Sequence, residues 1–313
     1  MKFNMKYTVP LAAMLLLAAC NSDQATDEKK TGDTAEKETS TYTVVDDRGK
    51  KITFDKTPET IVSLQPSNTE ILFSLGVGDK IIGATDYDTY PEAANDIERV
   101  STSTVINAER IVELNPDVVI AYTSGDESQV AQLEDAGLQV FVIKSAATFE
   151  DVYGDIEQLG DVVGKTEKAD DIIEEIQTQI KDIEEKTAAV ETKKKVYLEI
   201  SPAPEIWTSA SETFQNEILE AAGVENIFAD QAGWFSVAEE DVITKNPELI
   251  ITTVNYTEDP IGEIKSRASW NTIQAIKNGE VYQLDSDILS RPATRIGDAV
   301  KLVAETVYPE LFK

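Results

Sequence analysis

The sequence has no histidine and only one cysteine among its 313 residues. Without histidine the chain cannot build a Ser-His-Asp triad, a Cys-His pair, a zinc site with imidazole ligands or a haem site with an axial histidine. A single cysteine cannot close an intrachain disulfide. No GxSxG motif is present either, and we therefore expect a protein that is not an enzyme.

Basic residues are scarce, and long apolar runs are absent. Lysine and arginine number 28 against 58 acidic residues, so the formal net charge is -30. Such a balance argues against nucleic-acid binding, which needs a basic surface for the phosphates. No stretch reaches the roughly 20 apolar residues of a membrane span. The chain also has no P-loop, so any ATP hydrolysis must belong to another protein.

The one cysteine, Cys20, ends a segment that is typical of exported lipoproteins. Two lysines precede a mainly apolar run, which closes with Leu17-Ala18-Ala19-Cys20. This order predicts a signal peptide over residues 1–19, cleavage before Cys20 and lipidation of its thiol. Residues 20–40 lack aromatic and branched apolar side chains and are predicted to be a flexible linker. We expect a protein anchored by lipid to the extracytoplasmic face of the cell membrane.

The remaining residues alternate between short β-branched runs and helical patterns, which predicts an α/β fold with parallel strands. An N-terminal lobe is expected over residues 41–147, opening with a hairpin over 42–54, and is followed by a helical connection over 148–193 and a C-terminal lobe over 194–313. Isoleucines at helical spacing predict a helix from about Thr166 to Val190, roughly 37 Å long. Two similar α/β lobes joined by one long backbone helix would form a stiff hinge with a cleft between them.

An internal repeat supports the two lobes. Glu70-Ile71-Leu72 with Gly76-Val77 recurs as Glu217-Ile218-Leu219 with Gly223-Val224, and the segment 109–120 recurs as 240–251. In each copy of the second segment, a helix is expected to end before Asn-Pro and a buried strand to follow.

Aromatic residues recur where strands are predicted to end, and ligands bind at that edge of open α/β sheets. Flat, rigid side chains there suit a large, planar, partly apolar ligand. The residues at these positions are Tyr87, Tyr90, Tyr122, Trp207, Tyr256, Asp287 and Arg291, and Trp234 joins them from a predicted Gly-Trp-Phe turn.

Two helix starts are also predicted near this cleft. Ser67-Asn68-Thr69-Glu70 has the pattern of a capping box, whose free amides could receive a ligand oxygen. Arg291 and Arg295 enter the last helix, where either could bind a carboxylate, a phosphate or a surface acid. Lys144 is a further candidate cation.

Glu109 and Glu240 occupy the same place in the two copies of the repeat, early in a predicted helix. Such a pair suits a partner with two-fold symmetry and basic sockets.

With these features the chain resembles the substrate-binding lipoproteins of iron-complex and cobalamin ABC importers over residues 42–313. The segments 61–72, 85–91 and 291–295 are similar to cobalamin-binding members. The resemblance implies a helical-backbone periplasmic-binding-protein fold. It also implies that Tyr87, Tyr122, Trp207, Trp234 and Asp287 face a corrin and that Glu109 and Glu240 dock into a permease dimer. Arg291 stays a further candidate ligand residue because of its place before the last helix.

We therefore expect a monomeric receptor that takes up a metal chelate, with a cobalt corrinoid as the favoured ligand and no cofactor or resident metal. Its partner would be an ABC permease dimer with a cytoplasmic ATPase. Ferric siderophore and haem are the alternative ligands. A surface hydrolase would need convergent carboxylates, and an adhesin would have no small-molecule pocket.

Overall fold

The computed structural model describes residues 41–102, 105–123 and 128–313. Cys20 and the predicted signal peptide and linker lie outside these residues. The predicted hairpin is confirmed: β1 (Tyr42–Val45) pairs antiparallel with β2 (Lys51–Phe54). Its turn is held by the Asp46 carboxylate, which accepts hydrogen bonds from the backbone N–H groups of Arg48 and Lys50 at 3.0 Å each.

The N-terminal lobe is built on a five-stranded parallel sheet in the order β5-β4-β3-β6-β7. Helices connect the strands and cover the sheet, as the alternating pattern predicts. The strands are β3 (Ile61–Ser63), β4 (Ile81–Thr85), β5 (Arg99–Ser101), β6 (Val118–Thr123) and β7 (Val140–Lys144), and the helices are α1 (Pro66–Ser74), α2 (Ala108–Leu114) and α3 (Ser128–Asp135).

The C-terminal lobe has a six-stranded sheet in the order β11-β9-β8-β12-β13, with β10 also paired to β8. Its strands are β8 (Lys195–Ser201), β9 (Trp207–Ser209), β10 (Glu225–Asn226), β11 (Trp234–Ser236), β12 (Leu249–Thr252) and β13 (Val281–Gln283). Its helices are α6 (Phe214–Ala221), α7 (Glu239–Lys245), α8 (Pro260–Ser266), α9 (Gln274–Asn278), α10 (Ser286–Ser290) and α11 (Ile296–Val307).

This second sheet departs from the expected parallel pattern at one edge. β9 runs antiparallel to β8, and β11 runs antiparallel to β9. The five residues between β8 and β9 are too few for the crossover helix that a parallel connection requires. Trp234 is the first residue of β11 and does not lie in the expected Gly-Trp-Phe turn, so this prediction was wrong.

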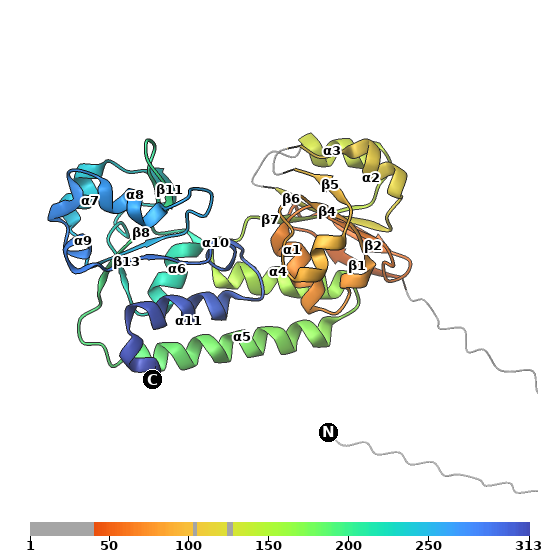
Figure 1. Cartoon of the computed structure of the whole chain (residues 1–313). Helices are drawn as coiled ribbons and strands as arrows, with labels where there is room; N and C mark the ends of the chain where they lie inside the picture. Colours follow the sequence, from red (N-terminus) through yellow and green to blue (C-terminus); the bar gives the residue numbers. More distant parts are fainter. Residues whose placement is uncertain (1–40, 103–104, 124–127) are drawn as a thin grey trace, which may run out of the picture. The chain divides into compact units, whose positions relative to one another are not determined.

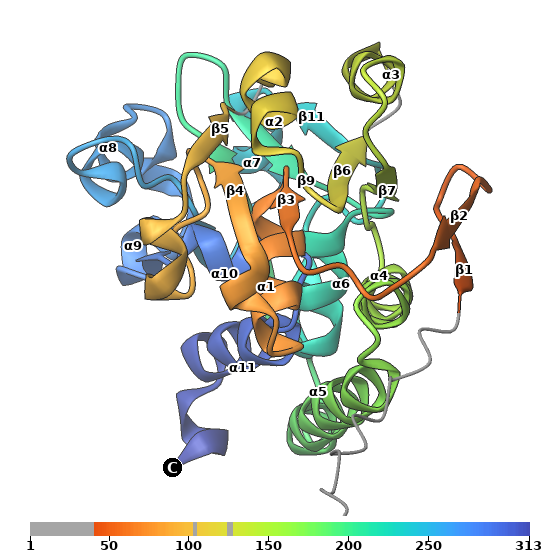
Figure 2. The same ribbon diagram turned by 90° about the vertical axis from the view of Figure 1, so that its right-hand side faces the viewer.

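Two helices connect the lobes. α4 (Phe149–Val162) follows the last strand of the N-terminal sheet, and α5 (Thr166–Thr187) is the predicted long helix. α5 ends three residues before the expected Val190, whose N–H instead closes a turn on the carbonyl of Thr187. Its 22 residues span about 33 Å. Figures 1 and 2 show α5 running beneath both lobes, with α4 and α11 packed against it.

One hydrophobic cluster runs through both lobes and the connection. It includes Ile120 of the N-terminal sheet, Ile176 of α5 and Ile251 of the C-terminal sheet, all at most 3% exposed. A shared, close-packed core resists relative movement of the lobes. The expected fold, two α/β lobes joined by a long helix, is confirmed.

The internal repeat is also a structural repeat. Asn115 ends α2 and Asn246 ends α7, each in the left-handed conformation with φ of 47°. A buried strand follows each of them within three residues, as predicted. Within the described part of the chain, no helix combines the length and the apolar character that a membrane span requires.

Candidate ligand site

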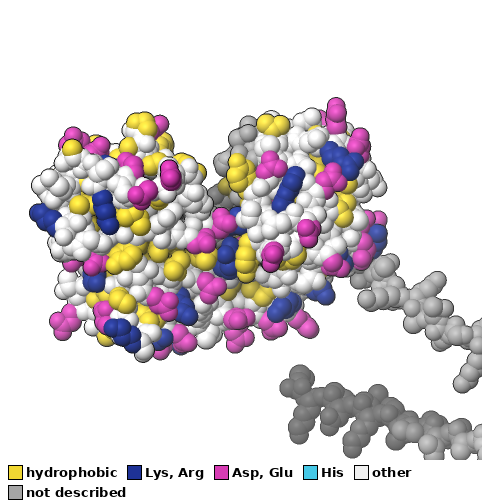
Figure 3. Space-filling view, in the orientation of Figure 1, with side chains coloured by type: hydrophobic (Ala, Val, Ile, Leu, Met, Phe, Trp, Pro, Cys, Tyr) yellow, Lys and Arg dark blue, Asp and Glu magenta, His cyan; other side chains and the backbone are white. Residues whose placement is uncertain are grey.

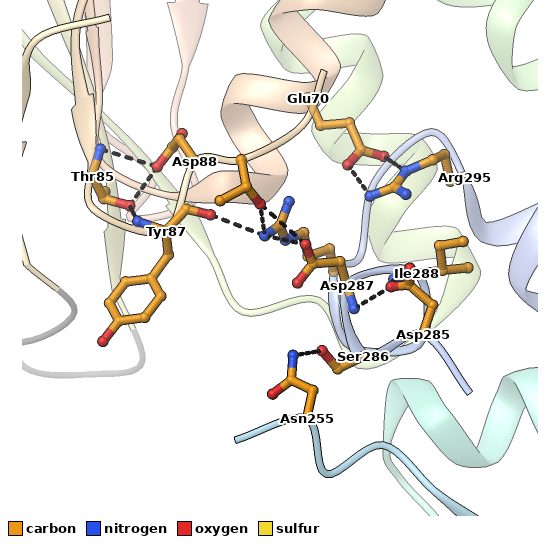
Figure 4. A network of polar contacts seen from close by, with 12 residues as sticks. Glu70, Thr85, Tyr87, Asp88, Asn255, Asp285, Ser286, Asp287, Ile288 and Arg295 are labelled. Carbon is orange, nitrogen blue, oxygen red and sulfur yellow. Dashed lines mark hydrogen bonds and ion pairs between the residues drawn. The ribbon is translucent and has the colours of Figure 1, made fainter. Parts of the chain in front are cut away.

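The N-terminal lobe presents Tyr87 from the loop that follows β4. Its backbone N–H donates to the Thr85 hydroxyl, and the Thr85 backbone N–H and hydroxyl both donate to the buried carboxylate of Asp88. Arg99 donates to the carbonyls of Thr85 and Asp88 at 2.9 Å. The loop is thus fixed from below, while the Tyr87 side chain is 56% exposed and its ring points away from these contacts (Figure 4). Tyr122 lies within β6, not after it, and is half-buried.

The C-terminal lobe presents Trp207 and Trp234 on the antiparallel pair β9–β11. Trp207 lies opposite Ser236, and Trp234 lies opposite Ser209. Opposed residues of an antiparallel pair share a face, so both indoles lie on one face, diagonally across the two strands.

The opposite face of this pair packs on the lobe's core through Phe235, whose ring meets that of the buried Phe228 edge-on at 5.5 Å. Trp207 and Trp234 therefore face away from the core. The Trp234 Nε1 donates to Gln215 Oε1 at 3.1 Å, which fixes the indole, yet the residue is 44% exposed. Trp207 is half-buried.

Asp287 and Arg291 lie on and just after α10 and reach across to the N-terminal lobe. The Arg291 guanidinium pairs with the Asp287 carboxylate at 2.7 Å and donates to the Tyr87 carbonyl and the Thr89 hydroxyl at 2.9 Å. Thr89 also donates to Asp287 at 3.1 Å. Figure 4 shows the network that joins Asp287 of the C-terminal lobe to Tyr87 of the N-terminal lobe. Arg291 is therefore engaged by protein groups through Nη2, whereas its buried Nη1 has no hydrogen-bond partner among the described residues.

Arg295 is engaged as well. It donates two hydrogen bonds, of 2.8 and 2.7 Å, to the carboxylate of Glu70 in α1, and its guanidinium lies 3.8 Å from the centre of the Tyr90 ring. Burial raises the pKa of the Glu70 carboxyl above its ordinary value, although the hydrogen bonds from Arg295 oppose this shift. The sequence leaves a carboxylate, a phosphate or a surface acid open as the partner of Arg295. In the structure its partner is an acid, the buried carboxylate of Glu70.

The predicted capping box at Ser67 is wrong. α1 begins at Pro66 with Gln65 as its N-cap, and no side chain caps it. Proline is favoured at the first helical position, so the helix starts before the serine could cap it. Ser67 and Glu70 consequently lie inside the helix and are buried.

The surface is hollowed between the two lobes, on the side away from α5 (Figure 3). A pocket of about 270 Å³ lies at the end of β13, lined by Asn255, Gln283 and the segment 284–287. Asn255 donates to Ser286 at 2.7 Å across it. Asp287 thus lines a pocket at the strand edge where the sequence predicts a ligand.

Lys144 lies apart from these residues, beside a second cavity of about 370 Å³. The cavity lies between the hairpin turn and α4, and its lining includes Asp47, Asp155 and Gln158. Asp155 is 6% exposed, and burial next to Asp47 and Asp151 raises its pKa to about 8. Carboxylates, not aromatic faces, surround Lys144.

Glu109 and Glu240 are exposed in the first turns of α2 and α7. In Figure 1 both helices lie on the side of the lobes away from α5. Their carboxylates are available to a partner at equivalent places of the two lobes.

Three residues of this region bind candidate site residues through contacts that the sequence does not predict. They are Glu70, Thr89 and Gln215. Only Glu70 carried a signal, because the repeat pairs it with Glu217.

The model of the family described as "Periplasmic binding protein" matches residues 61–288. An uncharacterised ABC transporter substrate-binding lipoprotein of Bacillus subtilis, YvrC, is 36% identical over 97% of this chain and 96% of its own length. The vitamin B12-binding protein of Vibrio campbellii is 34% identical over 78% of this chain and 88% of its own length.

Among solved structures, a possible iron-binding, periplasmic solute-binding protein of Staphylococcus epidermidis is 31% identical. It has a TM-score of 0.72 and covers 81% of this chain and all of its own. A substrate-binding protein of this class has no catalytic step, and the expectation that the chain is not an enzyme is confirmed. With its two lobes, its helical connection and these relatives, the chain belongs to the periplasmic binding protein family, as a substrate-binding protein of an ABC transporter.

Proposed function

We propose that the protein binds cobalamin or a related corrinoid between its lobes and delivers it to an ABC permease. The observation that carries this proposal is the state of the two cleft arginines. Arg291 is neutralised by Asp287, and Arg295 is neutralised by Glu70. Because each guanidinium charge is already balanced by a carboxylate, the arginines favour a ligand without strong net negative charge over a strongly anionic one.

The aromatic side chains support a broad ligand with apolar faces. Tyr87 and Trp234 are 56% and 44% exposed, on opposite lobes. Large aromatic groups left exposed in this way gain contact area when a ligand covers them. The 34% identical relative named for vitamin B12 binding supports the same ligand class.

A ferric siderophore, or haem, is the second candidate, favoured by the likeness to the possible iron-binding protein of Staphylococcus epidermidis. A siderophore receptor would need free cations in the cleft to meet an anionic chelate. The carboxylates paired with both arginines weigh against it.

Titration of the full chain with cyanocobalamin, a ferric catecholate and haemin distinguishes these ligands. Tryptophan fluorescence reports on the site because two of the three tryptophans, Trp207 and Trp234, lie on the proposed binding face. We expect saturable quenching by cyanocobalamin. Saturable quenching by the catecholate or haemin alone would overturn the proposal.

Replacing Trp234 by alanine tests the aromatic face. If the indole covers the ligand, the variant should lose about 1 to 3 kcal/mol of binding free energy, roughly a 5- to 150-fold weaker affinity by calorimetry. Val45→Ala is a matched control, since Val45 is 47% exposed and lies on the hairpin. Equal affinities of the two variants would remove Trp234 from the site.

We also propose that Glu109 and Glu240 dock into the permease and that Cys20 carries the lipid anchor. The matched positions of the two glutamates in the repeat support docking on a two-fold symmetric partner. The lipoprotein assignment of YvrC supports the anchor. Replacing Cys20 by serine should release the protein from the membrane fraction of cells, and retention there would contradict the anchor.

A further inference from the structure

The two lobes are joined by a buried ion pair close to the ligand residues. Glu70 is 1% exposed, and the Arg295 side chain is 13% exposed. Glu70 belongs to the first helix of the N-terminal lobe, whereas Arg295 directly precedes α11, the last helix of the C-terminal lobe. One turn further along, Ser74 and Thr294 share a hydrogen bond of 2.9 Å. Figure 4 shows the bidentate pair beside the network of Asp287.

The repeat places a second contact of the same kind on the other side. Glu217 occupies in α6 the position that Glu70 occupies in α1. Its carboxylate accepts a hydrogen bond from the backbone N–H of Phe149, the first residue of α4. α4, the connecting helix that follows the N-terminal sheet, packs on α1, and α11, the last helix of the C-terminal lobe, packs on α6. Each glutamate therefore reaches from the first helix of its own lobe to the start of the helix that packs on the first helix of the other lobe.

The Glu70 contact has little support from packing against the long helix. A cavity of about 650 Å³ lies beside it, lined by Ser74 and Thr294 on one side and by Ile176 and Gln179 of α5 on the other. Because side chains do not fill this space, the polar contacts add to the shared hydrophobic core in fixing the spacing of the lobes here. The segment that ends at Arg295 also carries Asp287 and Arg291, which hold Thr89 and the backbone of Tyr87.

We infer that Glu70 and Glu217 form a crossed pair of contacts that fixes the spacing of the two lobes, and that Glu70, acting through Arg295, is a positioning residue for the ligand site. The second part rests on the proposed function, and the first does not. Removing the Glu70 contact should let the segment carrying Asp287 move relative to the loop carrying Tyr87.

The spacing can be measured directly. In the full chain with Cys20→Ser, cysteines replacing the exposed Val112 on α2 and Thr244 on α7 would be the only thiols and could carry spin labels. Pulsed electron–electron double resonance then gives the distribution of distances between the two spin labels, one on each lobe. We expect Glu70→Gln to broaden or shift this distribution relative to the parent, and Glu217→Met, which removes the acceptor of the Phe149 N–H, to do so as well.

Glu199→Gln is the matched control. Glu199 is also 1% exposed and is paired by two hydrogen bonds, of 2.7 and 2.9 Å, with Arg267, but this pair lies within the C-terminal lobe. Glu199→Gln should lower the unfolding temperature of the protein without changing the distance between the spin labels. An unchanged distribution in Glu70→Gln, or an equal change in Glu199→Gln, would overturn the inference. If Glu70→Gln does not fold, Arg295→Lys tests the same contact, because lysine keeps the charge but loses the paired geometry.

A binding measurement separates the two parts of the inference. Calorimetry with cyanocobalamin should show a roughly 2- to 30-fold weaker affinity in Glu70→Gln, the range expected for coupling through packed contacts, and no change in Glu199→Gln. If the parent protein does not bind cyanocobalamin, the proposed function fails while the distance measurement still decides the crossed contact. Unchanged affinity together with a changed distance would reject the positioning role.

Discussion

Asp155 should make the stability of this protein fall as the pH rises. The residue lies on α4, is 6% exposed, and receives no hydrogen bond from the described residues. Burial, with smaller effects from Asp47 and Asp151, raises its pKa to about 8. In an unfolded chain the pKa of aspartate is about 3.9. Between these two pH values the folded protein keeps a proton that the unfolded chain has released.

The sign and the size of the effect follow from this difference. The folded state binds more protons, so the free energy of unfolding falls by about 1.4 kcal/mol for each pH unit in this window. The stabilisation is fully present below about pH 3.9 and is lost as the pH rises through about 8. Between pH 5 and pH 7, Asp155 alone should remove about 2.6 kcal/mol.

Asp155→Asn isolates this contribution, because asparagine has nearly the same shape and does not titrate. Urea unfolding of parent and variant at pH 5, 6 and 7 gives the difference in unfolding free energy at each pH. This difference should shift in favour of the variant by about 2 to 3 kcal/mol from pH 5 to pH 7. Glu157→Gln, at an exposed position of the same helix, is the control and should show no such shift. A difference between parent and Asp155→Asn that does not vary with pH would refute the reasoning.

Two further predictions use the repeat. Gly76 and Gly223 occupy equivalent places with φ of 79° and 76°, so alanine should cost about 1 to 2 kcal/mol at either position. At Gly223 the added Cβ would also lie 2.7 Å from the Cβ of Thr187, whereas at Gly76 it would meet no atom within 4 Å. Gly223→Ala should therefore show the lower midpoint in urea, and equal midpoints would contradict this packing argument. Replacing both Glu109 and Glu240 by arginine should leave ligand affinity unchanged but abolish uptake of labelled ligand by cells, and normal uptake would reject the docking role.

Much of the fold could be predicted from the sequence because its signals are local. Most of the predicted strands are short runs rich in β-branched residues, and the two copies of the repeat place a helix end and a buried strand in the same order. The left-handed Asn115 and Asn246 mark the same helix ends in both lobes. The antiparallel strands β9 and β11 could not be predicted in this way, because they are three residues long and carry no alternating pattern of their own.

The ligand site was predictable only as a set of candidates. The sequence indicates which aromatic and charged side chains lie near strand ends, but not which of them are already bound to one another. For Arg291 and Arg295 the nearest carboxylates come from residues 4 and 225 positions away. A separation of 225 positions in the sequence lies outside any local pattern.

The sequence by itself determined the two α/β lobes, the long helix and the absence of histidine chemistry, since these depend on composition and on periodicity over a few residues. Only the tertiary structure decided that the cleft arginines are neutralised and that Glu70 joins the lobes. The physical reason is that a charge is satisfied by whichever group lies within about 3 Å, and the fold alone brings residues 70 and 295 to that distance.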